Sequence, residues 1–524
     1  MKKIVYSSYY NYITVNGADL FTIVLLPNNS EKFPVIIRRS PYVDAFENWS
    51  EESIIWHYLK GHEKWLKNGY AVVYQHCRGR GKSTGDCIPY INEREDGLAL
   101  LDWVKERDFY NGELYLMGES YTTTVHYATA PFAKDIKGAI FGVQDSNRYN
   151  ICYRNGFFKK GLHGDWFVRN YKAKSHIKKN YTKNSFNILP LLDFSKTVFG
   201  KVVESFDELL KHPDINDEFW NHRYGGIETR NVTEHAKFPI LFTTGFYDLY
   251  TGGIFDMWNS LNEECKGISA LVVSPNDHGD NSKEYNFENG KREDAFGDDY
   301  VIRWFNYIRG VDHTAPFELG KITYYRLFEN KWSIAEGEFQ APNQMKFALG
   351  NNTVSYVYNP YDPPEFIGGL SRAFGGGCFQ EPPNSRYDIV TIYSDPFEND
   401  VFVKGKMSAK LCVQSDCEDT CFYIRVSIAK DQGDFGLRDD ITSLCFQLKE
   451  YIPGDVVTLD FSFDEHAFLI KKGEKIRVDI SSADNAHYVR HTNNKGLYSE
   501  QRFAKVANNT VYLKESFLIL PTER

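Results

Sequence analysis

Ser120 lies where the chain is expected to turn sharply from a buried strand into a helix. The preceding residues, 114–118, form a short apolar run that ends in Gly118 and is typical of a parallel strand. The following residues have the pattern of a helix that Pro131 would end. Such a turn exposes a serine hydroxyl at the carboxyl edge of a sheet, where it can act as a nucleophile. The alternative is a serine that only caps a helix.

Two further strand ends carry the residue types that a serine nucleophile needs. Asp248 follows the apolar run 238–245, and His278 follows the apolar run 270–274. Serine, then acid, then histidine is the chain order of the α/β-hydrolase triad, in which the histidine takes the serine proton and the acid orients the histidine. Asp248 could instead cap a helix, and His278 could be a surface residue. Residue type, chain order and position at strand ends together favour a triad.

The elements that must position these groups alternate between strands and helices over the first part of the chain. Helical periodicity marks residues 95–104 and the segment around 300–308. The expected strands occupy residues 11–26 (as a hairpin), 33–39, 71–74, 114–118, 238–245 and 270–274. This alternation predicts a doubly wound, mostly parallel sheet that helices cover on both faces.

Two segments break the alternation. Residues 146–235 hold few strand signals and are rich in lysine, asparagine, histidine and aromatic residues, which predicts a helical cap inserted over the sheet. From residue 340 onward, short alternating runs recur between turns, which predicts an all-β domain of jelly-roll type. We therefore predict an α/β-hydrolase catalytic domain at 1–145 and 236–339, a helical cap at 146–235, and a C-terminal jelly roll at 340–524.

The composition argues against several classes of function. The chain has 524 residues and a net charge of −9 without a long basic run, so nucleic acid is not an expected partner. No apolar stretch is long enough to span a membrane, and no signal peptide is expected. Nine cysteines without a signal peptide fit reduced thiols in the cytoplasm. The spacing of the cysteines at 412, 417, 421 and 445 matches no standard zinc pattern, so no metal is expected.

The motifs around these residues resemble a known family of hydrolases. The chain is similar to the cocaine esterase (CocE/NonD) family and to the related α-amino acid ester hydrolases and X-Pro dipeptidyl-peptidases of family S15. The motifs that carry the resemblance lie at 40–42 (Ser-Pro-Tyr), 78–85, 118–121 (Gly-Glu-Ser-Tyr), 245–248, 277–279 (Asp-His-Gly), 361–364, 393–398 and 478–482. The resemblance spans nearly the whole chain and is weakest in the cap segment.

The resemblance implies a role for individual residues. Ser120 corresponds to the nucleophile, His278 to the base, and Asp248 to the residue that orients the base. The Tyr42 hydroxyl and the backbone N–H of Tyr121 correspond to the two donors of the oxyanion hole. No metal and no cofactor are implied.

Aromatic residues near these positions are candidates for the acyl-binding pocket. We predict that Trp166 and Phe167 from the cap and Tyr250 from the acid loop line this pocket. The pattern around the nucleophile prefers glycine where this chain has Thr122 and Thr123. The two threonines imply a different packing at the turn and a narrower or re-aimed pocket, without removing a catalytic group.

The resemblance also bears on the substrate. By that resemblance, the α-amino acid ester hydrolases hold a substrate ammonium group with carboxylates at positions that are Leu249, Tyr250 and Thr123 here. A buried ammonium would lack a counter-charge at these neutral residues, which is costly. We also expect no counterpart of the long N-terminal helical domain that the larger X-Pro dipeptidyl-peptidases have, because the expected hairpin lies near the start of this sequence. We therefore expect an uncharged, bulky or aromatic acyl group, although Asp277 and Asp280 beside His278 could anchor an amine.

The expected function is hydrolysis of a small-molecule ester or amide through an acyl-enzyme, with a carboxylic ester as the favoured substrate. An X-Pro dipeptidyl-peptidase or another acyl-amide hydrolase is the alternative among enzymes. The alternative from another class is a jelly-roll binding protein on an inactive hydrolase scaffold, against which the intact triad argues. The sequence does not decide between a monomer and a homo-oligomer.

Overall fold

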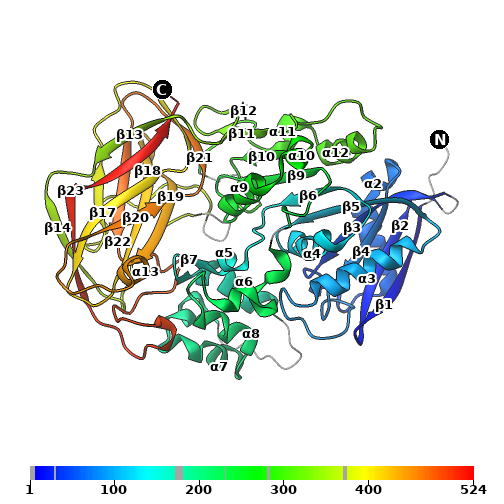
Figure 1. The fold of residues 1–524 in the computed structure, drawn as a ribbon, viewed down its shortest axis with the longest axis horizontal. Helices are drawn as coiled ribbons and strands as arrows, with labels where there is room; N and C mark the ends of the chain where they lie inside the picture. The colour runs from blue at the N-terminus through cyan, green and yellow to red at the C-terminus, as the bar shows by residue number, and fades with distance from the viewer. Residues whose placement is uncertain are drawn as a thin grey trace.

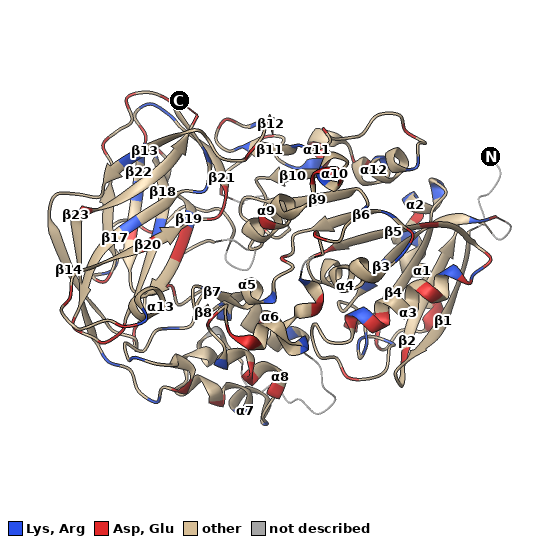
Figure 2. Cartoon of the chain, in the orientation of Figure 1, with Lys and Arg blue, Asp and Glu red and all other residues tan. Residues whose placement is uncertain are grey.

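The computed structural model describes residues 6–28, 31–171, 181–230, 232–279, 284–369 and 375–523. Figure 1 shows a large mixed sheet on the right and in the centre, a group of short helices at the bottom, and a β-rich C-terminal part on the left. Figure 2 shows acidic and basic residues interspersed over all three parts. Among the described residues, no helix combines the length and the apolar character that crossing a membrane would require.

A ten-stranded sheet is the framework of the catalytic part. Its spatial order is β1 (Ser7–Val15), β2 (Ala18–Leu26), β4 (Ala71–His76), β3 (Phe33–Ser40), β5 (Tyr110–Glu119), β6 (Ile136–Gly142), β9 (Ile240–Gly245), β10 (Ala270–Ser274), β11 (Ile322–Arg326) and β12 (Lys331–Ala335). All pairs from β4 to β11 are parallel, whereas the pairs at the two edges are antiparallel. The carboxyl ends of β5, β9 and β10 therefore meet at one edge of the sheet.

Helices cover both faces of this sheet because the buried strands are apolar on both sides. In β4, Ala71 and Val73 pack in one hydrophobic core and Val72 in the other, as alternation along a strand requires. The first core includes side chains of α3 (Glu93–Lys105), α4 (Tyr121–Thr129) and α9 (Thr251–Ser260). The second core includes side chains of α1 (Glu51–Gly61), α2 (Glu63–Lys67) and α12 (Tyr300–Ile308). The sheet is doubly wound.

The cap segment consists of short helices and a small hairpin. They are α5 (Arg148–Cys152), β7 (Tyr153–Arg154), β8 (Phe157–Phe158), α6 (Asp165–Asn170), α7 (Phe194–Phe199) and α8 (Glu204–Asp207), with several single turns of 3-10 helix between them. These helices are too short to be stable alone. A largely aromatic core, including Phe158, Phe186, Phe194 and Phe206, holds them together, and Val489 and Tyr498 of the C-terminal part contribute to it.

The C-terminal part is a pair of antiparallel sheets. One contains β13 (Asn343–Ala348), β14 (Thr353–Tyr358), β16 (Val401–Gly405), β17 (Ser408–Ser415), β20 (Val457–Ser462), β21 (His466–Ile470) and β23 (Ala507–Thr522). The other contains β15 (Val390–Tyr393), β22 (Lys475–Ser481), β18 (Cys421–Lys430) and β19 (Gly433–Ser443). The inward-facing residues of both sheets join one hydrophobic core. This is a β-sandwich, as the alternating runs predict.

The C-terminal part supports the loop that carries the predicted triad acid. The Tyr247 hydroxyl donates to the carbonyl oxygen of Gly436 in β19 at 3.0 Å. The buried Arg438 guanidinium donates to the carbonyl oxygen of Phe246. Phe246 and Tyr247 directly precede Asp248, so two contacts from β19 fix the backbone from which this carboxylate projects.

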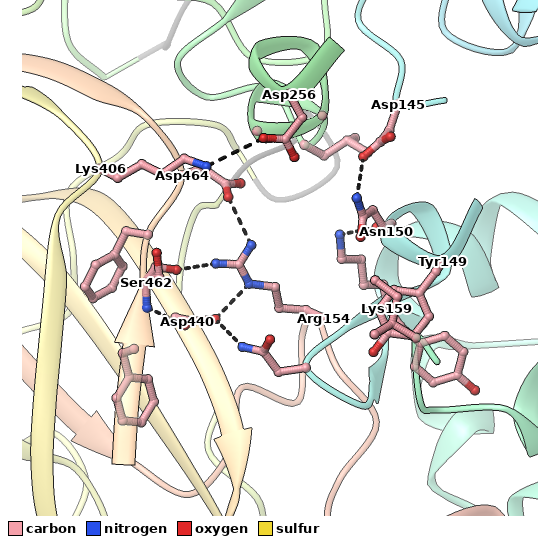
Figure 3. A pocket seen from close by; sticks show the side chains of 18 of the residues that line it. Asp145, Tyr149, Asn150, Arg154, Lys159, Asp256, Lys406, Asp440, Ser462 and Asp464 are labelled. Carbon is pink, nitrogen blue, oxygen red and sulfur yellow. Dashed lines mark hydrogen bonds and ion pairs between the residues drawn. The ribbon is translucent and has the colours of Figure 1, made fainter. Parts of the chain in front are cut away.

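A polar cavity of about 390 Å³ lies where the three parts meet (Figure 3). Arg154 of the cap forms ion pairs with Asp440 at 2.8 Å and Asp464 at 3.0 Å, both from the C-terminal part. Lys406 of the C-terminal part lies 3.7 Å from Asp256 of α9. The charged groups around the cavity thus link the three parts to one another.

Candidate active site

A strained turn presents Ser120 at the carboxyl end of β5. Its backbone has φ +54° and ψ −136°, a conformation that side-chain-bearing residues rarely adopt, and α4 begins at the next residue. A Cβ atom on Gly118 would lie 2.2 Å from the carbonyl oxygen of Thr122, so strand and helix approach too closely for any other residue there. Glycine before the turn and strain at the serine are the features of a nucleophile elbow.

The two threonines after the serine fit this turn and reinforce it. The Thr122 hydroxyl accepts from the backbone N–H of Glu119 at 2.7 Å and donates to the carbonyl oxygen of Glu119 at 2.6 Å. The buried Thr123 hydroxyl donates to the carbonyl oxygen of Gly142 at 3.0 Å. The hydroxyls thus anchor the first turn of α4 to β5 and β6.

The structure brings Ser120, His278 and Asp248 into one hydrogen-bonded chain. The distance from His278 Nε2 to Ser120 Oγ is 2.9 Å, and that from His278 Nδ1 to Asp248 Oδ2 is 2.6 Å. Asp248 is completely buried, and its Oδ1 accepts from the backbone N–H of Tyr250 at 2.8 Å. Since the Asp248 carboxylate accepts a hydrogen bond from Nδ1–H, the proton of the neutral ring is on Nδ1 and the lone pair is on Nε2, where it can take the Ser120 proton.

Charges around His278 favour its protonated form. Burial alone would lower the pKa of His278, but the negative charges of Asp248, Glu119 and Asp277 outweigh this effect and raise it above its ordinary value of 6.5. The resulting imidazolium is the species that forms when the serine gives up its proton. The acidic surroundings therefore favour the proton transfer to His278 that acylation requires.

Tyr42 and Tyr121 place two hydrogen-bond donors beside the serine. Burial raises the pKa of the Tyr42 phenol, whereas hydrogen bonds with the Ser120 and Trp166 side chains and the Tyr121 backbone N–H lower it. The Tyr42 hydroxyl therefore lies close to both the serine hydroxyl and the backbone N–H that follows it. A phenol and an N–H that both lie next to the nucleophile are donors of the kind that can stabilise an oxyanion.

A buried network holds Tyr121 in place. Its hydroxyl donates to Glu93 Oε1 at 3.1 Å and accepts from the backbone N–H of Tyr90 at 2.6 Å. The Glu93 carboxylate in turn lies 2.9 Å from the guanidinium of the buried Arg39. These partners are not among the site residues predicted from the sequence. Tyr90 and Glu93 come from a loop and the first turn of α3, where no periodic pattern or motif marks them.

Aromatic and aliphatic side chains gather next to the serine. Trp166 and Tyr250 pack against a small cluster that includes Tyr90, Tyr121 and Ile151. The Tyr250 ring also meets the His278 ring edge-on at 5.6 Å between centroids. Two of the three predicted pocket residues thus lie beside the triad.

Phe167 does not lie in this cluster, in contrast to our prediction. It is fully buried in the aromatic core of the cap, where its ring packs 4.7 Å from the rings of both Tyr171 and Phe206. Consecutive residues of a helix point about 100° apart. Trp166 and Phe167 are neighbours in α6 and consequently face different surroundings, one the site and the other the cap interior.

Asp277 and Asp280 are the two acidic residues next to His278 in the sequence. Asp277 is buried, and its carboxylate lies 2.9 Å from where a Cβ atom on Gly376 of the C-terminal part would be. Asp280 lies outside the described residues. Within the described ranges, no group of three or more histidine, cysteine, aspartate or glutamate side chains is arranged to hold a metal ion.

Comparisons with known proteins identify relatives over the whole chain. Residues 16–280 match the family model of X-Pro dipeptidyl-peptidase (S15 family), and residues 333–517 match that of the X-Pro dipeptidyl-peptidase C-terminal non-catalytic domain. A cocaine esterase from Rhodococcus sp. (strain MB1 Bresler) is 23% identical over 561 residues, which cover 94% of this chain and 93% of that protein.

Solved structures show the same fold. An α-amino acid ester hydrolase superposes with a TM-score of 0.82 at 17% identity, covering 99% of this chain and 96% of the other. An aminopeptidase from a marine sediment Thaumarchaeota archaeon gives 0.79 at 16% identity, with 98% and 96% covered. A CocE/NonD family hydrolase from Staphylococcus aureus gives 0.66 at 16% identity, with 98% and 93% covered. These matches confirm the predicted α/β-hydrolase fold with a C-terminal β domain.

Proposed function

This chain belongs to the X-Pro dipeptidyl-peptidase (S15) family, and we propose that it acts as a carboxylic-ester hydrolase. Family membership makes it a serine hydrolase related to the CocE/NonD enzymes. The observation that carries the proposal is the hydrogen-bonded chain from Ser120 through His278 to the buried Asp248. It supplies the nucleophile, the base and the orienting carboxylate that acyl transfer to a serine requires.

In the proposed reaction, Ser120 Oγ attacks the acyl carbon while His278 Nε2 takes its proton. The Tyr42 hydroxyl and the Tyr121 N–H donate to the oxyanion of the tetrahedral intermediate. The intermediate collapses as His278 gives the proton to the leaving alcohol, which leaves the acyl group on Ser120. Water then attacks the acyl-enzyme with His278 as base, and the carboxylic acid and the free serine are the products.

The surroundings of the serine support an uncharged acyl group. The hydrophobic cluster beside the triad includes Trp166, Tyr90 and Ile151. Tyr250 stands at a position where the resemblance places a carboxylate in α-amino acid ester hydrolases. The buried Glu93 is already paired with Arg39. An ammonium group on the acyl side would be desolvated without a dedicated counter-charge.

Neutral esters should therefore be better substrates than α-amino esters or X-Pro amides. We expect kcat/KM for p-nitrophenyl butyrate or benzoate to exceed that for alanine p-nitrophenyl ester roughly tenfold or more, since an unpaired buried ammonium is costly. The same preference should hold against Ala-Pro p-nitroanilide, with Ser120→Ala measuring background hydrolysis. A clear preference for Ala-Pro or Gly-Pro p-nitroanilide would instead identify a dipeptidyl-peptidase, the activity after which the family is named.

The pH dependence should depend on Glu119. The base must be neutral to accept a proton, so kcat/KM should fall at low pH with an apparent pKa above 6.5, the ordinary histidine value. Glu119→Gln removes a negative charge that favours the imidazolium. The pKa of His278 should then decrease, and the low-pH limb of the profile should move to lower pH.

The measurement is kcat/KM for p-nitrophenyl butyrate at low ionic strength, where screening is weakest. Glu106→Gln is a matched control, because it removes the same charge from an exposed carboxylate just after α3. This carboxylate forms an ion pair with Arg107 at 3.2 Å. It should leave the profile in place. A profile for Glu119→Gln that coincides with wild type, or that moves to higher pH, would contradict this expectation.

A further inference from the structure

One side chain of the cap contacts both predicted donors of the oxyanion hole. Trp166, in α6, donates its indole Nε1–H to the Tyr42 hydroxyl oxygen at 3.0 Å. Its ring stacks on the Tyr121 ring at 5.3 Å between centroids with 15° between the planes. Tyr121 also contributes the predicted backbone donor. Trp166 therefore connects the two groups that converge on Ser120, although they come from separate segments of the chain.

The chemistry of indole fixes the direction of the hydrogen bond to Tyr42. An indole N–H can only donate, so the Tyr42 oxygen must be the acceptor. Its own O–H is then left to donate elsewhere, and the Ser120 side chain is one of the groups close enough to the phenol to lower its pKa. A hydroxyl that accepts one hydrogen bond also becomes a better donor in the next. The contact thus orients the Tyr42 proton toward the reacting centre.

Tyr42 needs such an anchor more than Trp166 does. The Tyr42 residue is 43% exposed, on the loop that follows β3. Trp166 also packs against the buried His163, whose ring stacks on it at 5.8 Å between centroids with 19° between the planes. Its carbonyl oxygen accepts from the Asn170 side chain at 2.9 Å. The packed indole therefore holds the Tyr42 hydroxyl, which is the buried end of a residue that is 43% exposed as a whole.

We propose that Trp166 is a positioning residue for the oxyanion hole, which makes catalysis dependent on the cap. This role differs from lining the acyl pocket, because it acts on the transition state through Tyr42 and not on the substrate directly. It rests on the proposed oxyanion role of Tyr42. An interaction realised in the transition state affects kcat, whereas a pocket contact made equally in the bound substrate affects KM.

The test is a double-mutant cycle with p-nitrophenyl butyrate. Trp166→Phe keeps a stacked ring but removes the N–H, and we expect kcat to fall roughly tenfold with KM changed by less than about threefold, the scale of one lost hydrogen bond. In a Tyr42→Phe background, Trp166→Phe should cost no further activity, because the hydroxyl it positions is absent. Such non-additivity is the signature of residues that act as a unit.

Two further variants serve as a control for the cap and as a substitute for Trp166→Phe. Phe206→Leu loosens the aromatic core of the cap without touching Tyr42 or Tyr121, and it should leave kcat within about twofold of wild type, as substitutions away from the site usually do. Trp166→Met, which likewise lacks a donor, replaces Trp166→Phe in the cycle if thermal unfolding shows that the phenylalanine variant is not folded.

The outcomes separate this inference from the proposed function. Additive losses in the cycle, or a change confined to KM, would overturn the positioning role while leaving the triad intact. An equal loss of kcat in Phe206→Leu would likewise overturn it, because general loosening of the cap would suffice. An unchanged rate in Tyr42→Phe alone would remove the oxyanion role itself, and the inference with it.

Discussion

Replacing Ser120 by alanine should abolish turnover of p-nitrophenyl butyrate and leave the fold intact. The Ser120 hydroxyl supplies the attacking oxygen, and removing a triad serine costs on the order of a million-fold in kcat. The backbone strain at residue 120, with φ +54°, is the same for alanine as for serine. The thermal unfolding midpoint should therefore stay within a few degrees of wild type, as for a change of well under ~1 kcal/mol.

The control for this substitution is Ser355→Ala, which alters an exposed serine of β14 in the C-terminal part. It should retain wild-type turnover. His278→Ala should reproduce the loss seen in Ser120→Ala, because the two residues act as one unit. Turnover within tenfold of wild type in Ser120→Ala would contradict the assignment of the nucleophile.

Replacing Tyr42 by phenylalanine should lower kcat by roughly a hundred- to a thousand-fold, the cost of one lost oxyanion donor. The hydroxyl matters most once the oxyanion has formed, so KM should change little. Tyr42 is 43% exposed, and loss of its hydroxyl should have little effect on the free energy of unfolding. Steady-state kinetics and thermal unfolding of the purified variant measure both effects.

Tyr10→Phe provides the matched control, since Tyr10 is a tyrosine of β1 with a similar exposed fraction of 40%. It should be indistinguishable from wild type in kcat. If Tyr42→Phe also retained the wild-type rate, Tyr42 would only line the pocket, and the backbone N–H of Tyr121 would be left as the proposed donor.

The strands and helices that form the layers of the fold can be predicted from the sequence, because each one has a local pattern of apolar residues. The apolar run before Ser120 and the runs before Asp248 and His278 become β5, β9 and β10, each buried on both faces. The short strands β11 and β12 are not found in this way. Their pairing, and the antiparallel edge that they form, depend on contacts with distant segments that no local pattern encodes.

The same distinction between local signals and long-range contacts applies to the residues of the candidate site. A residue at a strand end has its position set by the strand, which is why the triad could be located from residue type, chain order and position at strand ends. Which side chains line the pocket depends on how α6 of the cap is rotated about its axis. The sequence does not show whether Trp166 or Phe167 faces the site. Tyr90 and Arg39 come from other parts of the chain and reach the site only through tertiary packing.

The most direct test of the central claim is covalent labelling with a fluorophosphonate probe, followed by peptide mapping. A fluorophosphonate reacts with a serine that an adjacent base activates, whatever the natural substrate is. We predict one equivalent of label per chain, located on Ser120, absent in Ser120→Ala and much slower in His278→Ala. A preparation that hydrolyses p-nitrophenyl esters but carries no label, or carries it on another residue, would contradict the proposed triad.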